Sequence, residues 1–273
     1  MKCTRPVLER CKTGPVEIVE CPCGKCPACL ANKAQMWTYR LYAESKLHKK
    51  SCFVTLTYND DNITRLYLSP TGIYSLDKKE LQNFMKRLRK NLSARIRFYG
   101  VGEYGGQTKR PHFHLIIYGL GENDEDRRII QQAWPYGFVS VASVSPRSIA
   151  YVARYCTKKL FSDGMDYVAE HVQPEFNLQS NRPGIGFNAI DKGVRCNPDG
   201  QMFCWYEGRK IAVPQYFKSK VRTSYQNFVA RKYALSARDE RIREFDRSGR
   251  NEFAESVQAE KNRLARIKPR RKV

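Results

Sequence analysis

Apolar residues between positions 51 and 160 recur with two different periods, which alternate along the chain. The segment 52–58 (CFVTLTY) is rich in β-branched and aromatic residues and ends at the turn sequence Asn59-Asp60-Asp61, which is typical of a strand. The next apolar residues follow the i, i+3, i+4, i+7 spacing of an amphipathic helix; they are Leu81, Phe84, Met85 and Leu88. Asp77 and Glu80 precede them at the spacing of a capping box.

The alternation continues beyond this strand and helix. The same criteria predict strands at 96–104, 112–118 and 137–144 and helices at 124–133 and 145–160. A Gly-rich loop, 105–111, separates the second and third strands and is suited to a hairpin. Ser145 and Pro146 fit the N-cap and the first position of the last helix. The resulting order, β-α-β-β-α-β-α, is typical of an α+β domain.

Outside this region the periodicity is weaker. Short strands are predicted around 203–206 and 211–213, and a charged helix or pair of helices over 230–267. We therefore divide the chain into four segments. They are a Cys-containing N-terminal segment at 1–45, a main domain at 46–190, a small β accessory segment at 191–217 and a basic helical tail at 218–273.

Charge and composition narrow the class of protein. Lys and Arg number 49 against 27 Asp and Glu, which gives a formal net charge of +22. The tail at 218–273 alone holds 17 basic and 7 acidic residues. Such an excess indicates a polyphosphate partner, and nucleic acid is the first candidate. No apolar run approaches the ~18 residues of a membrane span, so no membrane partner is expected. The N-terminal residues lack the apolar segment of a secretory signal, so we expect a reducing, cytoplasmic compartment and reduced or metal-bound cysteines.

His112 and His114 are separated by one residue in a predicted strand. Strand alternation turns both imidazoles to one face and Phe113 to the other, so the pair can chelate one cation. If the hairpin is centred near residues 107–108, Glu103 lies almost opposite His112 and adds a carboxylate. Two imidazoles and a carboxylate suit Mg²⁺ or Mn²⁺ shared with a phosphate. The alternative is a pair of packing or surface histidines.

Two tyrosines and a lysine share one face of the last predicted helix. Tyr151 and Tyr155 are one turn apart, and Lys158 follows on the same side. The apolar stripe of this helix lies nearly opposite, which argues against the alternative that the tyrosines pack in the core. A phenol with a pKa of ~10 is a poor nucleophile unless a Lewis acid and a cation assist it. The metal-binding residues and Lys158 can provide both, and attack on a DNA phosphate would leave a phosphotyrosine and a free 3′-hydroxyl.

With these motifs in place, the chain resembles the HUH rolling-circle replication initiators. The resemblance rests on FVTLTY, then Pro-His-Phe-His at 111–114, then Tyr-x₃-Tyr-x₂-Lys at 151–158. The Cys-rich sequence at 22–29 and Arg-Pro-Gly-Ile-Gly at 182–186 are similar to the initiators of microviruses, particularly the gokushovirus branch. The resemblance covers about residues 21–190 and does not include the basic tail.

This resemblance implies a fold, an activity and partners. It implies a ferredoxin/RRM-like antiparallel sheet of about five strands with flanking helices, with the histidines on a central strand. It also implies metal-dependent nicking and rejoining of supercoiled origin DNA in the cytoplasm of an infected bacterium. Tyr151 and Tyr155 take the nucleophile roles, His112 and His114 are metal ligands, and Glu103 is the expected third ligand. A host polymerase would extend the 3′-hydroxyl, and a host helicase is implied because the sequence has no P-loop motif.

Two further groups are candidates for binding. Cys21, Cys23, Cys26 and Cys29 can hold a structural Zn²⁺, although the spacing is compressed for a zinc ribbon; Cys3 and Cys11 can complete such a site, and reduced thiols before a helix are the alternative. Phosphate contacts are expected from four basic residues near the histidines and tyrosines, with ordinary solvated charge as the alternative; these are Lys109, Arg110, Arg154 and Lys159.

Two other functions compete with nicking. A non-catalytic protein can hold single-stranded nucleic acid by stacking and charge on an RRM-like sheet. A zinc-dependent hydrolase can use the histidines without the tyrosines. Only the nicking enzyme predicts a covalent protein–DNA adduct.

Overall fold

The computed structural model describes residues 3–10, 18–154, 170–189, 194–198, 201–206, 208–249 and 252–267. These residues form two compact units, one built from 37–192 and the other from 1–36 together with 193–273. The predicted division into four segments remains a prediction. Tyr155, Lys158, Lys159 and Cys11 lie outside the residues that the structure describes.

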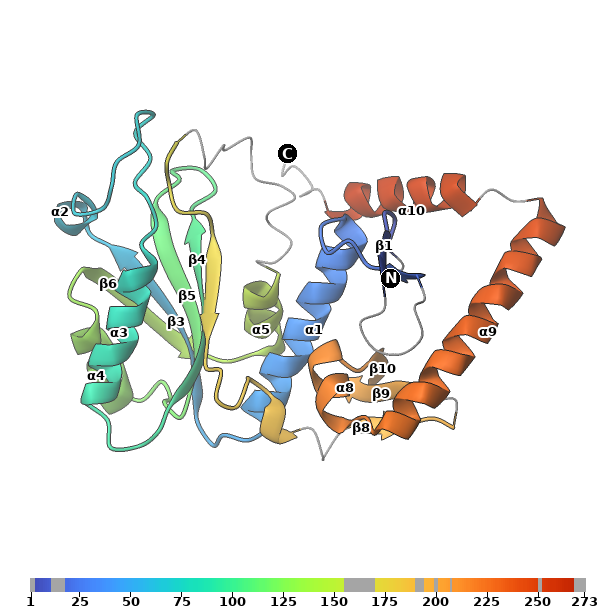
Figure 1. Ribbon diagram of the computed structural model, residues 1–273. Coiled ribbons are helices and arrows are strands. Elements are labelled where there is room, and N and C mark those ends of the chain that lie inside the picture. Colours follow the sequence, from blue (N-terminus) through green and yellow to red (C-terminus); the bar gives the residue numbers. More distant parts are fainter. Residues whose placement is uncertain are drawn as a thin grey trace. The chain divides into compact units, whose positions relative to one another are not determined.

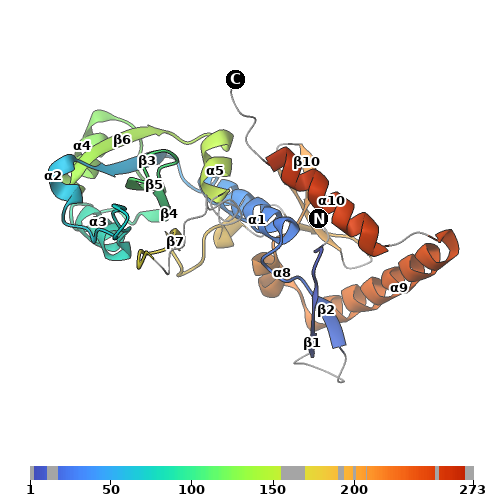
Figure 2. The same ribbon diagram turned by 90° about the horizontal axis from the view of Figure 1, so that it is seen from above.

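The larger unit is built on a five-stranded antiparallel sheet (Figure 1). Its strands are β3 (Ser51–Tyr58), β4 (Arg97–Tyr104), β5 (Pro111–Tyr118), β6 (Gly137–Ser143) and β7 (Phe176–Gln179). They lie in the order β6-β3-β5-β4-β7, which Figure 2 shows from above. Helix α3 (Lys78–Lys90) joins β3 to β4, and α4 (Asp124–Ala133) joins β5 to β6. This β-α-β-β-α-β connectivity confirms the predicted α+β fold, with β5 as the central strand.

One face of the sheet packs on α3 and α4 (Figure 1). Alternate residues of β3 are buried on this side, and the four helix residues predicted from their spacing are all buried in the same core. Asp77 is the N-cap of α3, where its side chain accepts a hydrogen bond from the backbone N–H of Lys79 at 2.7 Å. Burial of each of these large apolar side chains stabilises the fold by about 1.5–3 kcal/mol relative to exposure.

The other face of the sheet is covered by α5 (Pro146–Ala153) and by the second half of α1 (Pro27–Ser45). The rings of Trp37 on α1 and Tyr99 on β4 lie 4.8 Å apart, and the hydroxyl of Tyr118 donates to the carbonyl of Leu41 at 2.9 Å. Because both faces are covered, every residue of β4 is buried. The histidines therefore lie within a covered part of the sheet.

The ends of two elements follow from single residues. Ser145 caps α5 in a capping box with Ser148, and Pro146 takes the first turn, as predicted. Strand β6 begins at Gly137, whose φ is +155°; a Cβ there would lie 2.3 Å from the carbonyl oxygen of Thr57. Only glycine allows this close approach of β6 to β3. The part of the predicted helix beyond residue 154 falls outside the described residues.

The edge strand β7 was not predicted, because its sequence, Phe-Asn-Leu-Gln, is short and half polar. After it, the Arg-Pro-Gly-Ile-Gly motif at 182–186 lies against α1 and β4. The buried carboxylate of Glu44 accepts hydrogen bonds from the Arg97 side chain and from the backbone N–H of Gly186. Arg97 also donates to the carbonyl of Pro183 at 2.8 Å. This motif therefore has a structural role in joining three parts of the unit.

The remaining elements of the larger unit are the short helices α2 (Asp60–Ile63) and η1 (Phe187–Ala189). The smaller unit contains a hairpin of β1 (Val7–Arg10) and β2 (Ile18–Cys21), followed by the start of α1. It also contains a three-stranded antiparallel sheet of β8 (Val194–Cys196), β9 (Met202–Tyr206) and β10 (Arg209–Ala212). Helices α8 (Gln215–Val221), α9 (Ser224–Ser248) and α10 (Glu252–Ile267) follow. The predicted accessory strands and the pair of charged helices are confirmed. No described helix has the length and apolar character that crossing a membrane requires.

Candidate metal and nucleophile site

The β4–β5 hairpin brings together the three residues expected to bind a metal. Its register pairs Glu103 directly with His112, and His114 lies two residues further along the same face. One carboxylate oxygen of Glu103, Oε2, lies 3.4 Å from Nε2 of His112 and 3.3 Å from Nε2 of His114. The three ligand atoms all lie within 4.8 Å of one another. Their number, type and separation fit a single divalent cation.

The other ring nitrogen of each histidine is already engaged. Nδ1 of His112 lies 3.1 Å from the carbonyl oxygen of Arg110, and because a carbonyl only accepts, this nitrogen carries the hydrogen. Nδ1 of His114 is hydrogen-bonded to the hydroxyl of Thr55 on β3 at 3.0 Å. Partners of this kind fix the orientation of a metal-binding imidazole and direct Nε2 to the ligand. Both Nε2 atoms accordingly face Glu103.

The electrostatics of the group favour a positive charge between its members. Burial opposes ionisation of Glu103, but hydrogen bonds from His112 and His114 outweigh it and lower the pKa of this carboxyl group. Burial disfavours the imidazolium of His112, but the hydrogen bond to Glu103 outweighs it and raises the pKa of this histidine. A buried carboxylate thus holds a proton on its neighbour when no other cation is present. A divalent cation can take the place of that proton.

Tyr151 on α5 points at the same group. Its hydroxyl lies 3.4 Å from Nε2 of His114, and the two rings meet edge to face at 5.3 Å. Phe53 of β3 stacks on His114 at 5.5 Å and also contacts Tyr151, so it supports both rings. Tyr151 is 43% exposed, which leaves its ring accessible from solvent. Burial of the hydroxyl, together with the charge of Glu103, raises the pKa of Tyr151 to about 12.

The basic residues predicted to contact phosphate have different surroundings. The guanidinium of Arg110 donates to the carboxylate of Asp60 and to the carbonyl of Tyr58, both at 2.8 Å, so a phosphate contact would require exchange of these bonds. Lys109 lies in the hairpin loop with a φ of +51°, and Arg154 is the exposed C-cap residue of α5. Their contact with DNA remains a prediction.

Phe53 and Thr55 are site residues that the sequence analysis did not single out. Both lie in the FVTLTY strand, and Thr55 pairs with His114 in the β3–β5 register. The signal was present in the alternation of this strand, because Val54 and Leu56 face the core and the intervening residues must face the histidines. Which strand lies next to β5, however, cannot be read from local periodicity.

Comparison with known proteins agrees with this arrangement of an antiparallel sheet, a metal-binding hairpin and a neighbouring tyrosine. Residues 51–160, which contain all of these features, match the model of a family of phage replication proteins, described as replication-associated protein ORF2. This part of the chain is a replication-associated domain of that family. No solved structure matches the chain.

Three curated relatives are replication-associated proteins of phages. The chain is 28% identical to the replication-associated protein ORF2 of Spiroplasma virus 4, over 76% of the chain and 69% of the relative. It is 31% identical to the VP4 protein of Bdellovibrio phage phiMH2K, over 63% of the chain and 58% of the relative. For the ORF4 protein of Chlamydia phage 1 the identity is 29%, over 74% of the chain and 53% of the relative. The chain thus spans less than two thirds of the last two relatives. The resemblance to microvirus replication proteins is confirmed, and these relatives support a role in replication.

Proposed function

We propose that this protein starts and ends rolling-circle replication by nicking one DNA strand at the origin and later rejoining it. The observation that supports this reaction most directly is the position of the Tyr151 hydroxyl, 3.4 Å from Nε2 of His114. A potential nucleophile is thereby adjacent to three residues that fit a divalent cation. In this proposal Glu103, His112 and His114 hold Mg²⁺ or Mn²⁺.

The proposed reaction is a transesterification. The phenolic oxygen of Tyr151 forms a bond to the phosphorus of the scissile phosphodiester, and the bond from phosphorus to the 3′-oxygen breaks. The phenol loses its proton, and the departing 3′-oxygen takes one up, so the products are a 5′-phosphotyrosine and a free 3′-hydroxyl. One phosphodiester is exchanged for another, which is why rejoining needs no ATP.

The surroundings of Tyr151 explain why this reaction needs a cation. The pKa of Tyr151 is raised to about 12, so the hydroxyl remains protonated at neutral pH in the metal-free protein. A divalent cation, when bound, supplies positive charge that polarises the phosphate and offsets the carboxylate of Glu103. Phe53 and His114 hold the phenol ring at the edge of the site, where a phosphate can approach from solvent.

Tyr155 and Lys158 complete the proposal. Helical spacing places Tyr155 one turn after Tyr151, so it is the proposed nucleophile for the second cut, at the regenerated origin. Lys158 would favour the phenolate by its charge. Lys109, Arg110, Arg154 and Lys159 are the proposed contacts to the DNA backbone. Host polymerase and helicase would act on the nicked supercoiled DNA, in the cytoplasm of the infected bacterium.

The test is a search for the covalent adduct. The full chain is incubated with Mn²⁺ or Mg²⁺ and labelled single-stranded oligonucleotides, linear and hairpin, that tile the whole phage replicon. We expect an adduct that survives denaturing electrophoresis, is lost with chelator and is lost when Tyr151→Phe is combined with Tyr155→Phe. Tyr67→Phe, at a tyrosine that is 51% exposed, is the matched control and should retain full activity.

The same assay separates the competing functions. A non-catalytic strand-binding protein would retard the oligonucleotides without forming an adduct under any condition. A hydrolase would cut them without an adduct, and its activity would survive loss of both tyrosines. Either result would refute the proposed nicking reaction.

A further inference from the structure

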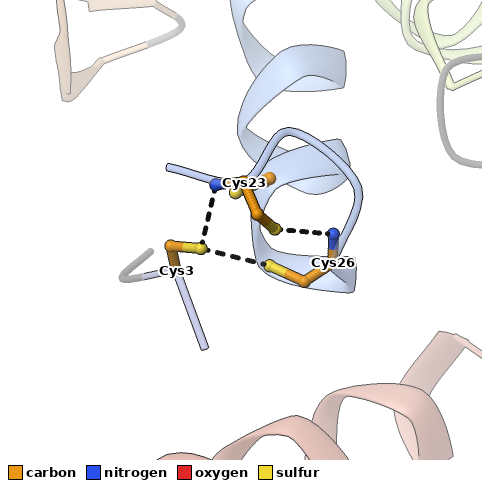
Figure 3. A group of neighbouring side chains, drawn as sticks. Cys3, Cys23 and Cys26 are labelled. Atoms are coloured by element: carbon orange, nitrogen blue, oxygen red, sulfur yellow. Dashed lines mark hydrogen bonds between the residues drawn. The ribbon is translucent and has the colours of Figure 1, made fainter. Parts of the chain in front are cut away.

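Four cysteines from separate parts of the smaller unit converge on one point. Cys3 precedes β1, Cys23 follows β2, and Cys26 and Cys29 lie at the start of α1 (Figure 3). Their four sulfur atoms all lie within 4.8 Å of one another. All four are thiols, without disulfide bonds. No part of the proposed nicking reaction uses them.

The spacing of the sulfurs fits one tetrahedral ion. Sγ of Cys3 and Sγ of Cys26 are 3.7 Å apart, far beyond the S–S bond of about 2.05 Å in a disulfide. With Zn–S bonds of about 2.3 Å, tetrahedral geometry separates two sulfurs by roughly 3.8 Å. The observed separation is therefore that of two ligands on one zinc ion.

Backbone groups around the cluster are arranged as they are around thiolates. The N–H of Cys23 donates to Sγ of Cys3, and the N–H of Cys26 donates to Sγ of Cys23, both at 3.3 Å (Figure 3). Hydrogen bonds to a charged acceptor are stronger than those to a neutral one, so these contacts favour ionised sulfur. Cys26 and Cys29 are buried, and Cys3 and Cys23 are half-buried, which limits access of water.

The hairpin register explains which cysteines meet. Val7 pairs with Cys21, so the chain before Val7 runs back alongside the chain after Cys21. Continuing this antiparallel register places residue 3 opposite residue 25, between Cys23 and Cys26. The expected set was wrong in one member, because Cys3 takes the place of Cys21, which is the last residue of β2. Cys11 lies outside the described part of the chain.

The cluster is also the local core. Among the described residues, the buried group at this position consists of Cys26, Ala28 and Cys29, with Cys3 and Cys23 packed against it. A group this small, made mostly of thiols, buries too little apolar surface to hold a hairpin on a helix by itself. Small units of this kind are commonly stabilised by a metal.

We propose that Cys3, Cys23, Cys26 and Cys29 bind one Zn²⁺ in a closed structural site that fastens the N-terminal hairpin to the start of α1. Four thiolates select a soft ion such as zinc, whereas Glu103 and the two histidines suit the harder Mg²⁺ or Mn²⁺. The chain would therefore carry two metals of different chemistry, and the zinc site stands independently of the nicking reaction.

Metal content of the full-length protein tests this site. The chain is purified without chelator under reducing conditions, and its zinc and iron are measured by mass spectrometry. We expect one equivalent of zinc, retained in Cys21→Ser and in His112→Ala/His114→Ala, and lost at least tenfold in Cys3→Ser. Cys21→Ser is the matched control, because it removes a neighbouring thiol outside the cluster.

A second measurement covers the case in which Cys3→Ser fails to fold. Cobalt is exchanged into the wild-type protein, and its absorption spectrum reports how many thiolates surround it in tetrahedral geometry. Four thiolates support the site. Fewer thiolates, zinc that persists in Cys3→Ser, equal loss of zinc in Cys21→Ser, or iron with acid-labile sulfide in place of zinc would each overturn the proposal.

Discussion

At the scale of single residues, the site depends on side chains that touch no substrate. Thr55 holds Nδ1 of His114, the carbonyl of Arg110 holds Nδ1 of His112, and Phe53 supports both His114 and Tyr151. Each contact leaves Nε2 directed at Glu103. Orientation of the ligands is thus supplied by the strand next to them and by the hairpin loop.

Replacing Thr55 with valine tests this orientation. The substitution Thr55→Val removes the hydrogen bond to His114 at nearly constant volume, and we expect metal affinity to fall about 10- to 100-fold with little change in stability. Thr57→Val is the control, because the Thr57 hydroxyl donates to the carbonyl of Phe138 instead. Calorimetric titration with Mn²⁺ measures both. Equal affinities in the two variants would show that the Thr55 hydroxyl does not orient the ligand.

The raised pKa of His112 predicts how stability depends on pH. Because its folded-state pKa lies above the ordinary value of ~6.5, the charged pair with Glu103 stabilises the metal-free protein below that value. This contribution is lost as the pH rises through the raised pKa. Metal binding displaces the same proton, so stabilisation by Mn²⁺ should increase across that window.

Thermal melting from about pH 5.5 to 8.5, with and without Mn²⁺, measures this effect. The shift in Tm caused by Mn²⁺ should grow with pH in the wild type. In Glu103→Gln the shift should be small throughout, since the pair is broken. A shift that is independent of pH in the wild type would contradict protonation of His112 in the metal-free protein.

At the scale of elements, the buried carboxylate of Glu44 joins a helix, a strand and a loop. It accepts from Arg97 on β4, from the N–H of Gly186, and from His48 one turn along its own segment. These contacts hold the Arg-Pro-Gly-Ile-Gly motif against the sheet. The motif that resembles those of microvirus initiators is therefore explained by packing, without a direct part in the chemistry.

Breaking this network should destabilise the larger unit. In Glu44→Gln the guanidinium of Arg97 remains buried without its counter-charge, and we expect the free energy of unfolding to fall by about 3–5 kcal/mol. Glu125→Gln, at an exposed position on α4, is the control and should change stability by less than about 0.5 kcal/mol. Urea unfolding followed by circular dichroism measures both variants. A change as small as that of the control would show that the network contributes little.

At the scale of the whole molecule, the net charge of +22 favours any nucleic acid, whatever its sequence. The last six residues, 268–273, include four of the basic groups. Their removal should weaken binding to a non-specific oligonucleotide and reduce the slope of log K against log salt by up to about 3, if all four contact phosphates of a single strand. Fluorescence anisotropy at several salt concentrations measures the slope. An unchanged slope would mean that these residues do not contact the DNA.

Local periodicity was sufficient for the sheet because each strand and helix of the larger unit carries its own pattern. It was insufficient where a contact depends on distant partners. Strand β7 is too short and polar to be recognised alone, and it exists because β4 offers it an edge. The metal residues were predictable because a hairpin is a local structure. Cys3 was not predicted as a member of the cysteine cluster, because its place depends on the register of a separate hairpin.

The alternation of strand β5 has a consequence for how the protein fails. Phe113 and Leu115 secure the core on one side of this strand, while His112 and His114 occupy the other. A slip of one residue would turn phenylalanine toward the carboxylate and imidazole into the hydrophobic interior, so no partly shifted strand can persist. Heating should therefore abolish metal binding and core packing together, at a single temperature.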